Sequence, residues 1–527
     1  QSDKGFDTYS SLHQWSVNNP GEFWSRAWDD NKVIGSKGST FYIQGEDFLS
    51  SKFFPQAQLN VAENLLAHGD PDEVAIVSIL ETGVRSEITW AELRIKVAAT
   101  AAAMRAEGVV VGDRVVAWVP NVTEAIIYGL GALSIGAVVS TASPDFAPHA
   151  VEDRFGQVEP KIFLAADGYN YNGKYFDCSE KSAEIEKLLP TVKKMVRISE
   201  FDSWIAPFMG AEAVFEQLPF DHPGFVLFSS GTTGKPKCIT HSGAGVMLKA
   251  QSELLYQFNI SKGNKVFFFT TCGWMMWNWL VASLATGAEI VLFDGNPMYP
   301  APERLFDIAE AEELTFLGVS AKYIDSIRKS ELAPKNSHNL SKLRTIASTG
   351  SPLSHEGFTY IYESVAPTVH LASISGGTDI CGCFMLGWPE LPVFAGQIQV
   401  PALGMDVQVL NSDGTQTKPG DKGELVCANT FPSAPLFFWG DKENEKYIAS
   451  YFEKFPDIWT HGDFVEPTQE SGFIMHGRSD ATLNVAGVRI GTAEIYRITE
   501  EFEEVLESLA VAQKYESDTR VLLFLKL

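Results

Sequence analysis

Cysteine is scarce in this sequence, and basic residues are outnumbered by acidic ones. Only six of the 527 residues are cysteines, and the closest pair, Cys381 and Cys383, lacks the spacing of redox or zinc sites. A chain of this size needs no disulfide framework, so we expect buried thiols and a reducing, cytoplasmic location. Lysine and arginine number 41 against 66 acidic residues, a formal net charge of -25. This charge disfavours nucleic acid and anionic membranes as partners.

The sequence also lacks an apolar N-terminal leader and an uninterrupted membrane span. Residues 1–15 contain no hydrophobic run of the kind found in signal peptides. Residues 266–288 carry no charge over a length that could cross a bilayer, but threonine, asparagine and glycine interrupt them. We interpret this stretch as strand, helix and strand of a buried α/β layer, and we expect no stable membrane insertion. The oligomeric state stays open.

Alternating strand and helix patterns dominate the chain after residue 60 and predict an α/β fold. A capping box at Thr89–Glu92 predicts the start of a helix that ends at Gly108, and similar units follow. Short connections between these units imply parallel strands covered on both faces, and their recurrence predicts two doubly wound sheets. Closely spaced glycines and short apolar runs at about 395–476 predict a small β-barrel. Residues 61–479 would together form one large domain.

The two ends of the chain differ from this large domain. Residues 1–60 are rich in tryptophan and phenylalanine, which predicts an N-terminal helical cap packed on the main body. Residues 480–527 predict the start of an α+β domain, with a helix from just after Arg489 to about residue 512. Because a strand-like run stops abruptly at Leu527, we expect this C-terminal domain to be incomplete.

A loop rich in glycine and hydroxyl groups follows the strand-like stretch GFVLFSS at residues 224–230. A glycine-rich turn after a strand exposes consecutive backbone N–H groups, which form a concave anion site. The hydroxyls of Thr232 and Thr233 and the ammonium of Lys235 would add donors and positive charge. The loop is not a Walker A loop, because its glycines are too close together and Pro236 replaces the metal-binding hydroxyl. It therefore predicts a polyphosphate site of another type.

This loop, SSGTTGKPK at residues 229–237, resembles the phosphate loop of the adenylate-forming superfamily, which includes acyl-CoA synthetases, adenylation domains of peptide synthetases and luciferases. Further stretches match motifs of that superfamily in the expected order: STGSP at 348–352, SISGGTD at 373–379, WTHGD at 459–463 and GRSDATLN at 477–484. Longer stretches, among them LHQWSVNNPGEFW and CGWMMWNWL, resemble the acyl-CoA synthetases that act on acetoacetate. The likeness extends over essentially the whole chain.

The resemblance implies a ligase reaction in two steps. The carboxylate of the acid attacks the α-phosphorus of ATP, which gives an acyl-adenylate and pyrophosphate. The thiol of coenzyme A then displaces AMP and gives a thioester. ATP, Mg2+ and coenzyme A are thus the implied cofactors and co-substrates, with acetoacetate as the acid. Another short acid, such as propionate or butyrate, and a silent nucleotide-binding or carrier-loading relative remain as alternatives.

The same resemblance implies roles for individual residues. Thr233, Lys235 and Arg489 would be catalytic, whereas the lysine that relatives carry far along their C-terminal domain has no counterpart in this chain. Asp379 stands where most of the superfamily has a glutamate, and its carboxylate would hold Mg2+. The residues implied in binding ATP or AMP are Ser229, Ser230, Gly231, Thr232, Thr233, Gly234, Lys235, Gly350, Ser351, Pro352, Ser373, Ile374, Ser375, Gly376, Gly377, Thr378, Asp463, Arg478 and Arg489.

The resemblance also implies an acid-binding pocket, formed by Trp274, Met275, Thr349 and Gly376. Related enzymes that act on acetate carry a tryptophan at the position of Gly376. Glycine is therefore expected to remove a wall and to leave room for the longer acetoacetate. For Met276 the pattern does not decide between the pocket and the core.

Two positions near the C-terminus are implied in the second step. Asp480 would be the hinge about which the mobile C-terminal domain turns between the two reactions. Gly487 would lie near the tunnel for the pantetheine arm of coenzyme A. His461 replaces a threonine common in the superfamily, and we assign it no catalytic role.

Overall fold

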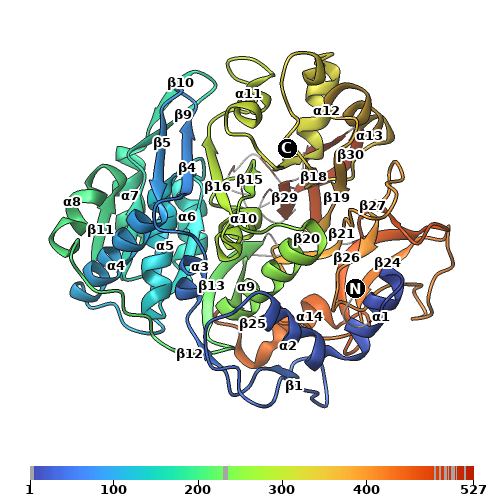
Figure 1. Cartoon of the computed structure of the whole chain (residues 1–527), viewed down its shortest axis with the longest axis horizontal. Coiled ribbons are helices and arrows are strands. Elements are labelled where there is room, and N and C mark those ends of the chain that lie inside the picture. The colour runs from blue at the N-terminus through green and yellow to red at the C-terminus, as the bar shows by residue number, and fades with distance from the viewer. Residues whose placement is uncertain are drawn as a thin grey trace.

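Two large sheets form the body of the molecule, side by side in Figure 1, and each has seven strands within the described part of the chain. The computed structural model describes residues 5–229, 235–479, 482–485, 488–491, 495, 498–499, 502, 505, 507–515 and 518–526. The first sheet has the spatial order β11 (Lys194–Arg197), β8 (Ile162–Ala165), β6 (Arg114–Trp118), β7 (Val138–Ala142), β13 (Pro223–Ser229), β14 (Lys237–Ser242) and β25 (Pro435–Phe438).

The second sheet is built in the same way. Its spatial order is β19 (His370–Ser373), β18 (Thr345–Thr349), β17 (Phe316–Ser320), β15 (Lys265–Phe268), β16 (Glu289–Asp294), β4 (Val74–Leu80) and β5 (Arg85–Thr89). Neighbouring strands are parallel except at the edge, where β5 is antiparallel to β4. The predicted α/β fold with two such sheets is confirmed. The antiparallel edges, including β13–β14 and β14–β25 in the first sheet, were not predicted.

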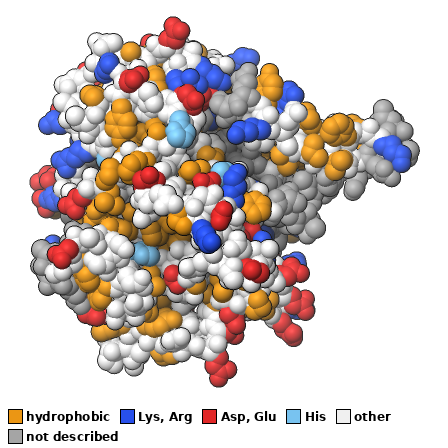
Figure 2. All heavy atoms as spheres, turned by 90° about the vertical axis from the view of Figure 1, so that its right-hand side faces the viewer, with side chains coloured by type: hydrophobic (Ala, Val, Ile, Leu, Met, Phe, Trp, Pro, Cys, Tyr) orange, Lys and Arg blue, Asp and Glu red, His pale blue; other side chains and the backbone are white. Residues whose placement is uncertain are grey.

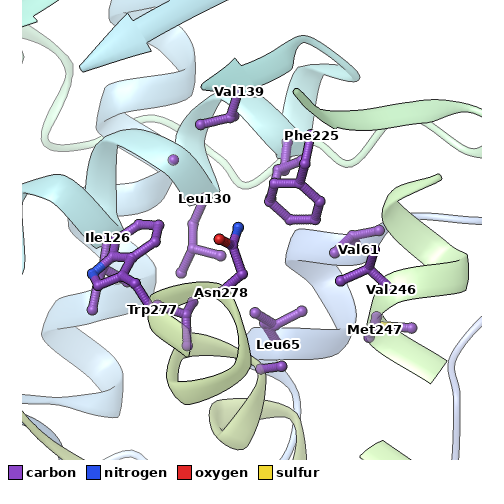
Figure 3. Close-up of a pocket in the computed structure, with 14 residues that line it drawn as sticks. Val61, Leu65, Ile126, Leu130, Val139, Phe225, Val246, Met247, Trp277 and Asn278 are labelled. Carbon is purple, nitrogen blue, oxygen red and sulfur yellow. The ribbon is translucent and has the colours of Figure 1, made fainter. Parts of the chain in front are cut away.

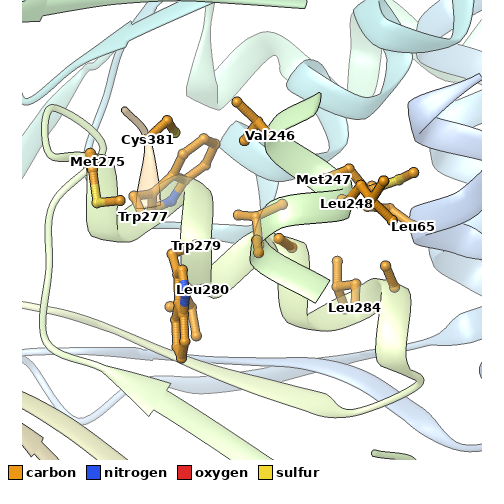
Figure 4. Packing of buried hydrophobic residues seen from close by; sticks show 14 of the residues in the cluster. Leu65, Val246, Met247, Leu248, Met275, Trp277, Trp279, Leu280, Leu284 and Cys381 are labelled. Carbon is orange, nitrogen blue, oxygen red and sulfur yellow. The ribbon is translucent and has the colours of Figure 1, made fainter. Parts of the chain in front are cut away.

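A layer of helices is shared by the two sheets. It contains α3 (Val61–Leu66), α4 (Trp90–Ala106), α5 (Thr123–Ile135), α9 (Gly243–Ser252) and α10 (Met275–Ala282). Helix α5 contacts β7 of the first sheet and β4 of the second, and one continuous apolar core joins all three. Figure 4 shows this packing around α9 and α10, where Met247, Trp277 and Leu284 are labelled.

Other helices cover the outer faces of the sheets. Helices α6 (Pro148–Phe155) and α7 (Ser179–Leu188) cover the first sheet, and α11 (Arg304–Ala311), α12 (Ala321–Lys329) and α13 (His355–Tyr360) cover the second. The uncharged stretch at 266–288 contains most of β15 and all of α10, as the buried-layer interpretation predicted. Among the helices of the described residues, none is both long and apolar enough to cross a bilayer.

Side chains of every type share the face seen in Figure 2. Among the described residues on it, acidic, basic and hydrophobic side chains are interspersed, with no continuous basic area. Each of the six cysteines lies in the described part, is buried and takes part in no disulfide. Burial raises the pKa of the Cys178 thiol to about 11 and that of Cys427 to about 12. The predicted role of the cysteines as small buried residues is therefore confirmed.

The N-terminal segment packs on a region far along the chain. Helices α1 (Tyr9–Asn18) and α2 (Pro20–Asp30) come first, and the short strands β1 (Tyr42–Ile43), β2 (Lys52–Phe53) and β3 (Gln58–Leu59) follow. The Tyr9 hydroxyl donates to the carbonyl of Pro401 at 2.5 Å, and the Gly404 N–H donates to Ser16 Oγ at 2.8 Å. These contacts hold the segment against the antiparallel part of the molecule.

Short antiparallel strands make up the region predicted as a small barrel. One sheet runs in the order β23 (Val407–Leu410), β24 (Gly423–Cys427), β26 (Trp459–Pro467) and β27 (Phe473–Arg478). A second runs in the order β20 (Ser375–Gly377), β21 (Gly382–Leu386) and β22 (Val400–Pro401). A bridge between Ile398 and Phe473 links the two, and α14 (Glu445–Tyr451) packs beside β26.

The C-terminal part departs from the prediction. Strands β28 (Thr482–Val485) and β29 (Val488–Gly491) pair with each other, and so do β30 (Glu507–Tyr515) and β31 (Asp518–Lys526). The helix expected to about residue 512 is wrong from Glu507 onward. The local sequence favours a helix, but pairing with the apolar, strand-forming stretch of β31 overrides that preference. Among the earlier residues, those at 495, 498 and 499 are helical.

The capping box at the start of α4 makes a direct prediction about stability. The Thr89 side chain accepts from the N–H of Glu92 at 3.2 Å, and Glu92 Oε2 accepts from the N–H of Thr89 at 2.9 Å. Thr89→Ala should lower the free energy of unfolding by about 1 kcal/mol, measured by urea titration. Thr123 is the matched control, because it lies inside α5 and its side chain is not the cap. An equal loss in Thr123→Ala would contradict the prediction.

Candidate active site

The motifs of the sequence converge where the ends of β13, β18 and β19 meet the antiparallel strands. His241 on β14 contacts the carbonyl of Thr378 at 3.0 Å. The Thr349 hydroxyl donates to the carbonyl of Ile374 at 3.1 Å. A Cβ on Gly377 would lie 3.6 Å from the His461 ring. Four stretches far apart in the sequence are thus neighbours in one site.

The phosphate loop connects two paired strands. Ser229 at the end of β13 is the register partner of Lys237 at the start of β14, so the loop closes an antiparallel hairpin. Ser230, Gly231, Thr232, Thr233 and Gly234 lie outside the described residues. The Lys235 side chain is 62% exposed, and its Nζ is 3.9 Å from Asp153 Oδ1. An ammonium at this position faces solvent and is available to an incoming anion.

The Asp379 carboxylate is the buried charge at the centre of the site. Its side chain is 1% exposed, the Tyr451 hydroxyl donates to Oδ1 at 2.6 Å, and Lys237 Nζ lies 3.4 Å from the same oxygen. The Lys237 ammonium also lies 4.7 Å from the centre of the Tyr451 ring, a cation–π distance. Together, Tyr451 and Lys237 fix the orientation of this carboxylate.

The sequence interpretation did not name Lys237 or Tyr451 as site residues. Lys237 could have been found, because it closes the loop motif itself. Tyr451 gives no local signal, since it lies on α14, more than seventy residues from Asp379. Its ring stacks on Trp459 at 3.8 Å, so the helix is held against the strand that carries Asp463.

The site fits a metal ion only if other ligands come from a substrate. Within the described residues, no group of three or more His, Cys, Asp or Glu side chains is placed to hold a metal ion. Asp379 offers one carboxylate. Mg2+ is commonly bound by one or two carboxylates together with phosphate oxygens and water, so this carboxylate is compatible with it.

A second carboxylate, that of Asp463, lies opposite an arginine across two strands. Asp463 on β26 and Arg478 on β27 are register partners, and Arg478 Nη1 donates to Asp463 Oδ1 at 3.1 Å. Arg478 Nη2 donates to the carbonyl of His461 at 3.1 Å, and His461 Nε2 lies 3.6 Å from Asp463 Oδ2. Both partners of the Asp463–Arg478 pair are about nine-tenths buried. The carboxylate is thus oriented before any ligand arrives.

The STGSP motif at 348–352, which contains three of the predicted ATP-binding residues, begins at the end of β18. Gly350 has φ +88°, a conformation that favours glycine, and the turn through Ser351 and Pro352 leads to α13. The Ile374 N–H donates to the carbonyl of Ser348 at 2.9 Å, which aligns this turn with the segment at 373–379. The contacts of these residues with ATP remain a prediction.

The structure corrects the reason given for Gly376. A Cβ on Gly376 would lie 1.9 Å from the Gly382 carbonyl oxygen and 2.7 Å from Cys383 Cα. The space beside this glycine is therefore filled by the backbone of β21 and is not an opened wall of a pocket. Glycine is required here because β20 and β21 approach so closely.

The other predicted pocket residues lie around α10. Trp274 precedes the helix and is 38% exposed, whereas Met275 and Met276 are buried members of the core. Met276 is as buried as Met275, at 7% exposed, so burial does not separate the two. Asp480 and Gly487 lie outside the described residues. For Arg489 the structure describes the backbone, which pairs with Asn484 in β28–β29.

An apolar cavity lies apart from these motifs. It has a volume of about 30 Å³, and Figure 3 shows Asn278 pointing into it between Leu130, Phe225 and Leu65. Asn278 Oδ1 has no hydrogen-bond partner among the described residues. The space suffices for about one water molecule. None of the predicted site residues lines it.

Comparison with known proteins gives consistent results. The family described as AMP-binding enzyme matches residues 66–431. The acetoacetyl-coenzyme A synthetase of Rhizobium meliloti (strain 1021) is 48% identical over 99% of this chain and 82% of the relative. The acetoacetyl-CoA synthetase of Gallus gallus is 42% identical over 98% of this chain and 81% of the relative. The structure titled acetoacetyl-CoA synthetase from Streptomyces lividans matches with a TM-score of 0.88 and 38% identity, over 99% of this chain and 82% of that one.

His241 predicts a pH dependence of stability. Its ring lies between the carbonyls of Ser433 and Thr378, and burial lowers its pKa from 6.5 to about 4. Between pH 6.5 and pH 4 the unfolded chain binds a proton at His241 that the folded protein does not bind. The contribution of neutral His241 to the free energy of unfolding is therefore complete above pH 6.5 and is lost as the pH falls toward 4. The free energy of unfolding should fall by up to about 1.4 kcal/mol per pH unit there.

The test compares His241→Gln with the wild-type protein by urea titration at pH 7, 6 and 5. The variant should show a flatter dependence on pH, because it lacks the group that titrates. Exposed His149 provides the control, and His149→Gln should follow the wild-type curve. Parallel curves for His241→Gln and wild type would show that His241 does not cause the effect.

Proposed function

The chain belongs to the AMP-binding enzymes, in the acetoacetyl-CoA synthetase family, and we propose that it ligates acetoacetate to coenzyme A through an acyl-adenylate. It is an AMP-forming acid–thiol ligase that uses ATP. The observation that supports the proposal is a pair of oriented, buried carboxylates: Asp379 lies 3.4 Å from Lys237 at the start of β14, and Asp463 is held by Arg478. The family supplies the reaction, and these carboxylates would be partners for a nucleotide.

Attack of a carboxylate on the α-phosphate brings two anions together, so the site must offset negative charge. Lys235, exposed at the end of the loop, would meet the outer phosphates with Thr232 and Thr233. Arg489 would lie near the α-phosphate. These groups act as fixed cations and donors toward the charge that develops in the transition state. Ser229, Ser230, Gly231 and Gly234 would contribute to the same cradle.

Asp379 would hold Mg2+ together with phosphate oxygens and water. When bound, the ion neutralises charge on the phosphates. Tyr451 and Lys237 keep the carboxylate in place before the nucleotide binds, which lowers the cost of ordering it. Because the Lys237 ammonium is close to the same oxygen, it also offsets the charge of the carboxylate while no cation is bound.

The nucleoside would be held by two further segments. Asp463 would accept hydrogen bonds from the ribose hydroxyls, with Arg478 and His461 fixing its orientation. The adenine ring and α-phosphate would contact the segments at 350–352 and 373–378. Gly487 would lie beside the pantetheine arm in the second step, with Asp480 as the hinge.

A cytoplasmic location is also part of this proposal. It rests on the six buried, unpaired thiols, which suit a reducing compartment. Small molecules are the expected partners.

The substrate proposal predicts the outcome of a direct assay. The full-length protein, with a complete C-terminal domain, is given ATP, Mg2+ and coenzyme A, and thioester is measured with acetate, propionate, butyrate and acetoacetate. Acetoacetate should have a kcat/KM at least about ten-fold above the other acids, as expected for a chain whose relatives are acetoacetyl-CoA synthetases. A preference for another acid would keep the ligase reaction and refute the substrate. No thioester from any acid would favour a silent or carrier-loading relative.

Asp463 gives a prediction about nucleotide binding. Asp463→Asn removes a charged acceptor, so the KM for ATP should rise by about 10- to 100-fold, as expected for charge-assisted hydrogen bonds. The control is Glu466→Gln on the same strand, where Glu466 pairs with His476 instead. Initial rates at varied ATP measure both variants. An unchanged KM in Asp463→Asn, or an equal rise in Glu466→Gln, would contradict the assignment.

A further inference from the structure

A fully buried ion pair lies beneath the antiparallel strands of the site. Lys249 on α9 and Glu253 in the π-helical turn η3 (Glu253–Gln257) are four residues apart, so they lie on the same side of the helical segment. Both side chains are 0% exposed, and the Lys249 ammonium donates to Glu253 Oε1. Burying two charges is unfavourable unless their remaining hydrogen-bonding groups are also paired.

The remaining groups of this pair are used by β21 and α10. Lys249 Nζ donates to the carbonyl of Cys383 at 3.0 Å, and the N–H of Cys383 donates to Glu253 Oε1 at 2.9 Å. The Trp279 indole N–H donates to Glu253 Oε2 at 2.9 Å. One ion pair therefore holds both backbone groups of a single residue of β21 and joins them to the helix that follows Trp274.

Two glycines place the backbone of β21 in direct contact with both the ion pair and β20. A Cβ on Gly382 would lie 3.1 Å from Glu253 Oε1 and 3.3 Å from Lys249 Cγ. A Cβ on Gly376 would in turn lie 1.9 Å from the Gly382 carbonyl oxygen. No side chain separates the ion pair from β21 or β21 from β20, so the backbone at Gly376 rests directly on a segment that the pair holds.

We propose that the Lys249–Glu253 pair is a positioning device that fixes β21 beneath Gly376 and thereby sets the shape of the acid-binding part of the site. The inference rests on the proposed function and on the resemblance, which implies that the acid binds near Gly376. Apolar residues of similar volume could fill the same space at little cost in stability. They could not bind the N–H and carbonyl of Cys383, which is what the charged pair does.

The test replaces both charges at nearly constant volume. Lys249→Met combined with Glu253→Met avoids the unpaired buried charge that either single substitution would leave. Arg85→Met with Glu312→Met is the matched control, because this pair joins the edge strand β5 to the segment after α11 and has a buried glutamate. Trp279→Phe is a milder second variant, which removes one donor to Glu253 and changes no charge.

Hydrogen exchange measures the positioning without relying on activity. In the Lys249/Glu253 variant, the peptide containing Cys383 should exchange at least about ten-fold faster than in wild type, because its N–H loses its acceptor. Trp279→Phe should show a smaller change in the same direction, and the Arg85/Glu312 variant none at this peptide. Unchanged exchange at Cys383 in both test variants would overturn the proposal.

Kinetics measure the consequence for the acid. The KM for acetoacetate should rise by about ten-fold or more while the KM for ATP stays within about two-fold, and the preference for acetoacetate over butyrate should fall. A parallel change in both KM values, or an unchanged preference, would overturn the role in acid binding. A wild-type protein that makes no thioester from any acid refutes the proposed function instead, and the exchange rates then decide alone whether the pair positions β21.

Discussion

The carboxylate of Asp379 ties together parts of the chain that are far apart in sequence. Tyr451 from α14 and Lys237 from the β13–β14 hairpin meet on one of its oxygens, and the carbonyl of the preceding residue, Thr378, contacts His241 on β14. A buried carboxylate without such partners would be strongly destabilising. This one charge therefore links the β13–β14 hairpin to α14 and to the segment at 373–379.

Close backbone packing of β20 against β21 is a second constraint on the site. Gly376 lets β20 approach β21 until no side chain fits between them, and Gly382 lets β21 approach the buried Lys249–Glu253 pair on its other side. Charge partners orient the carboxylates of Asp379 and Asp463, and backbone contacts fix β20 against β21. The two halves of the site meet at the turn between Gly376 and Asp379.

Local signals in the sequence were enough for much of the fold. The capping box at Thr89 started a helix as expected, and strand–helix alternation gave two sheets. The resemblance of the motifs to those of a known superfamily implied the site, and the structure brings the ends of β13, β18 and β19 together with β26. What local signals could not give were partners from distant segments. Tyr451 reaches Asp379 only through the packing of α14, and β30 forms because β31 pairs with it.

The case of Gly376 shows why a residue type alone can mislead. Its missing side chain suggested an open wall, but the structure places a carbonyl oxygen where the wall would be. Space in a folded protein depends on what lies opposite, and no pattern within the 373–379 motif contains that information.

A site that activates acetoacetate by adenylation must also run that step in reverse. Exchange of labelled pyrophosphate into ATP, measured with Mg2+ and without coenzyme A, tests this directly. We expect exchange that requires acetoacetate and stops when the acid is omitted. Exchange that is absent with acetoacetate, or that proceeds equally well without any acid, would contradict it.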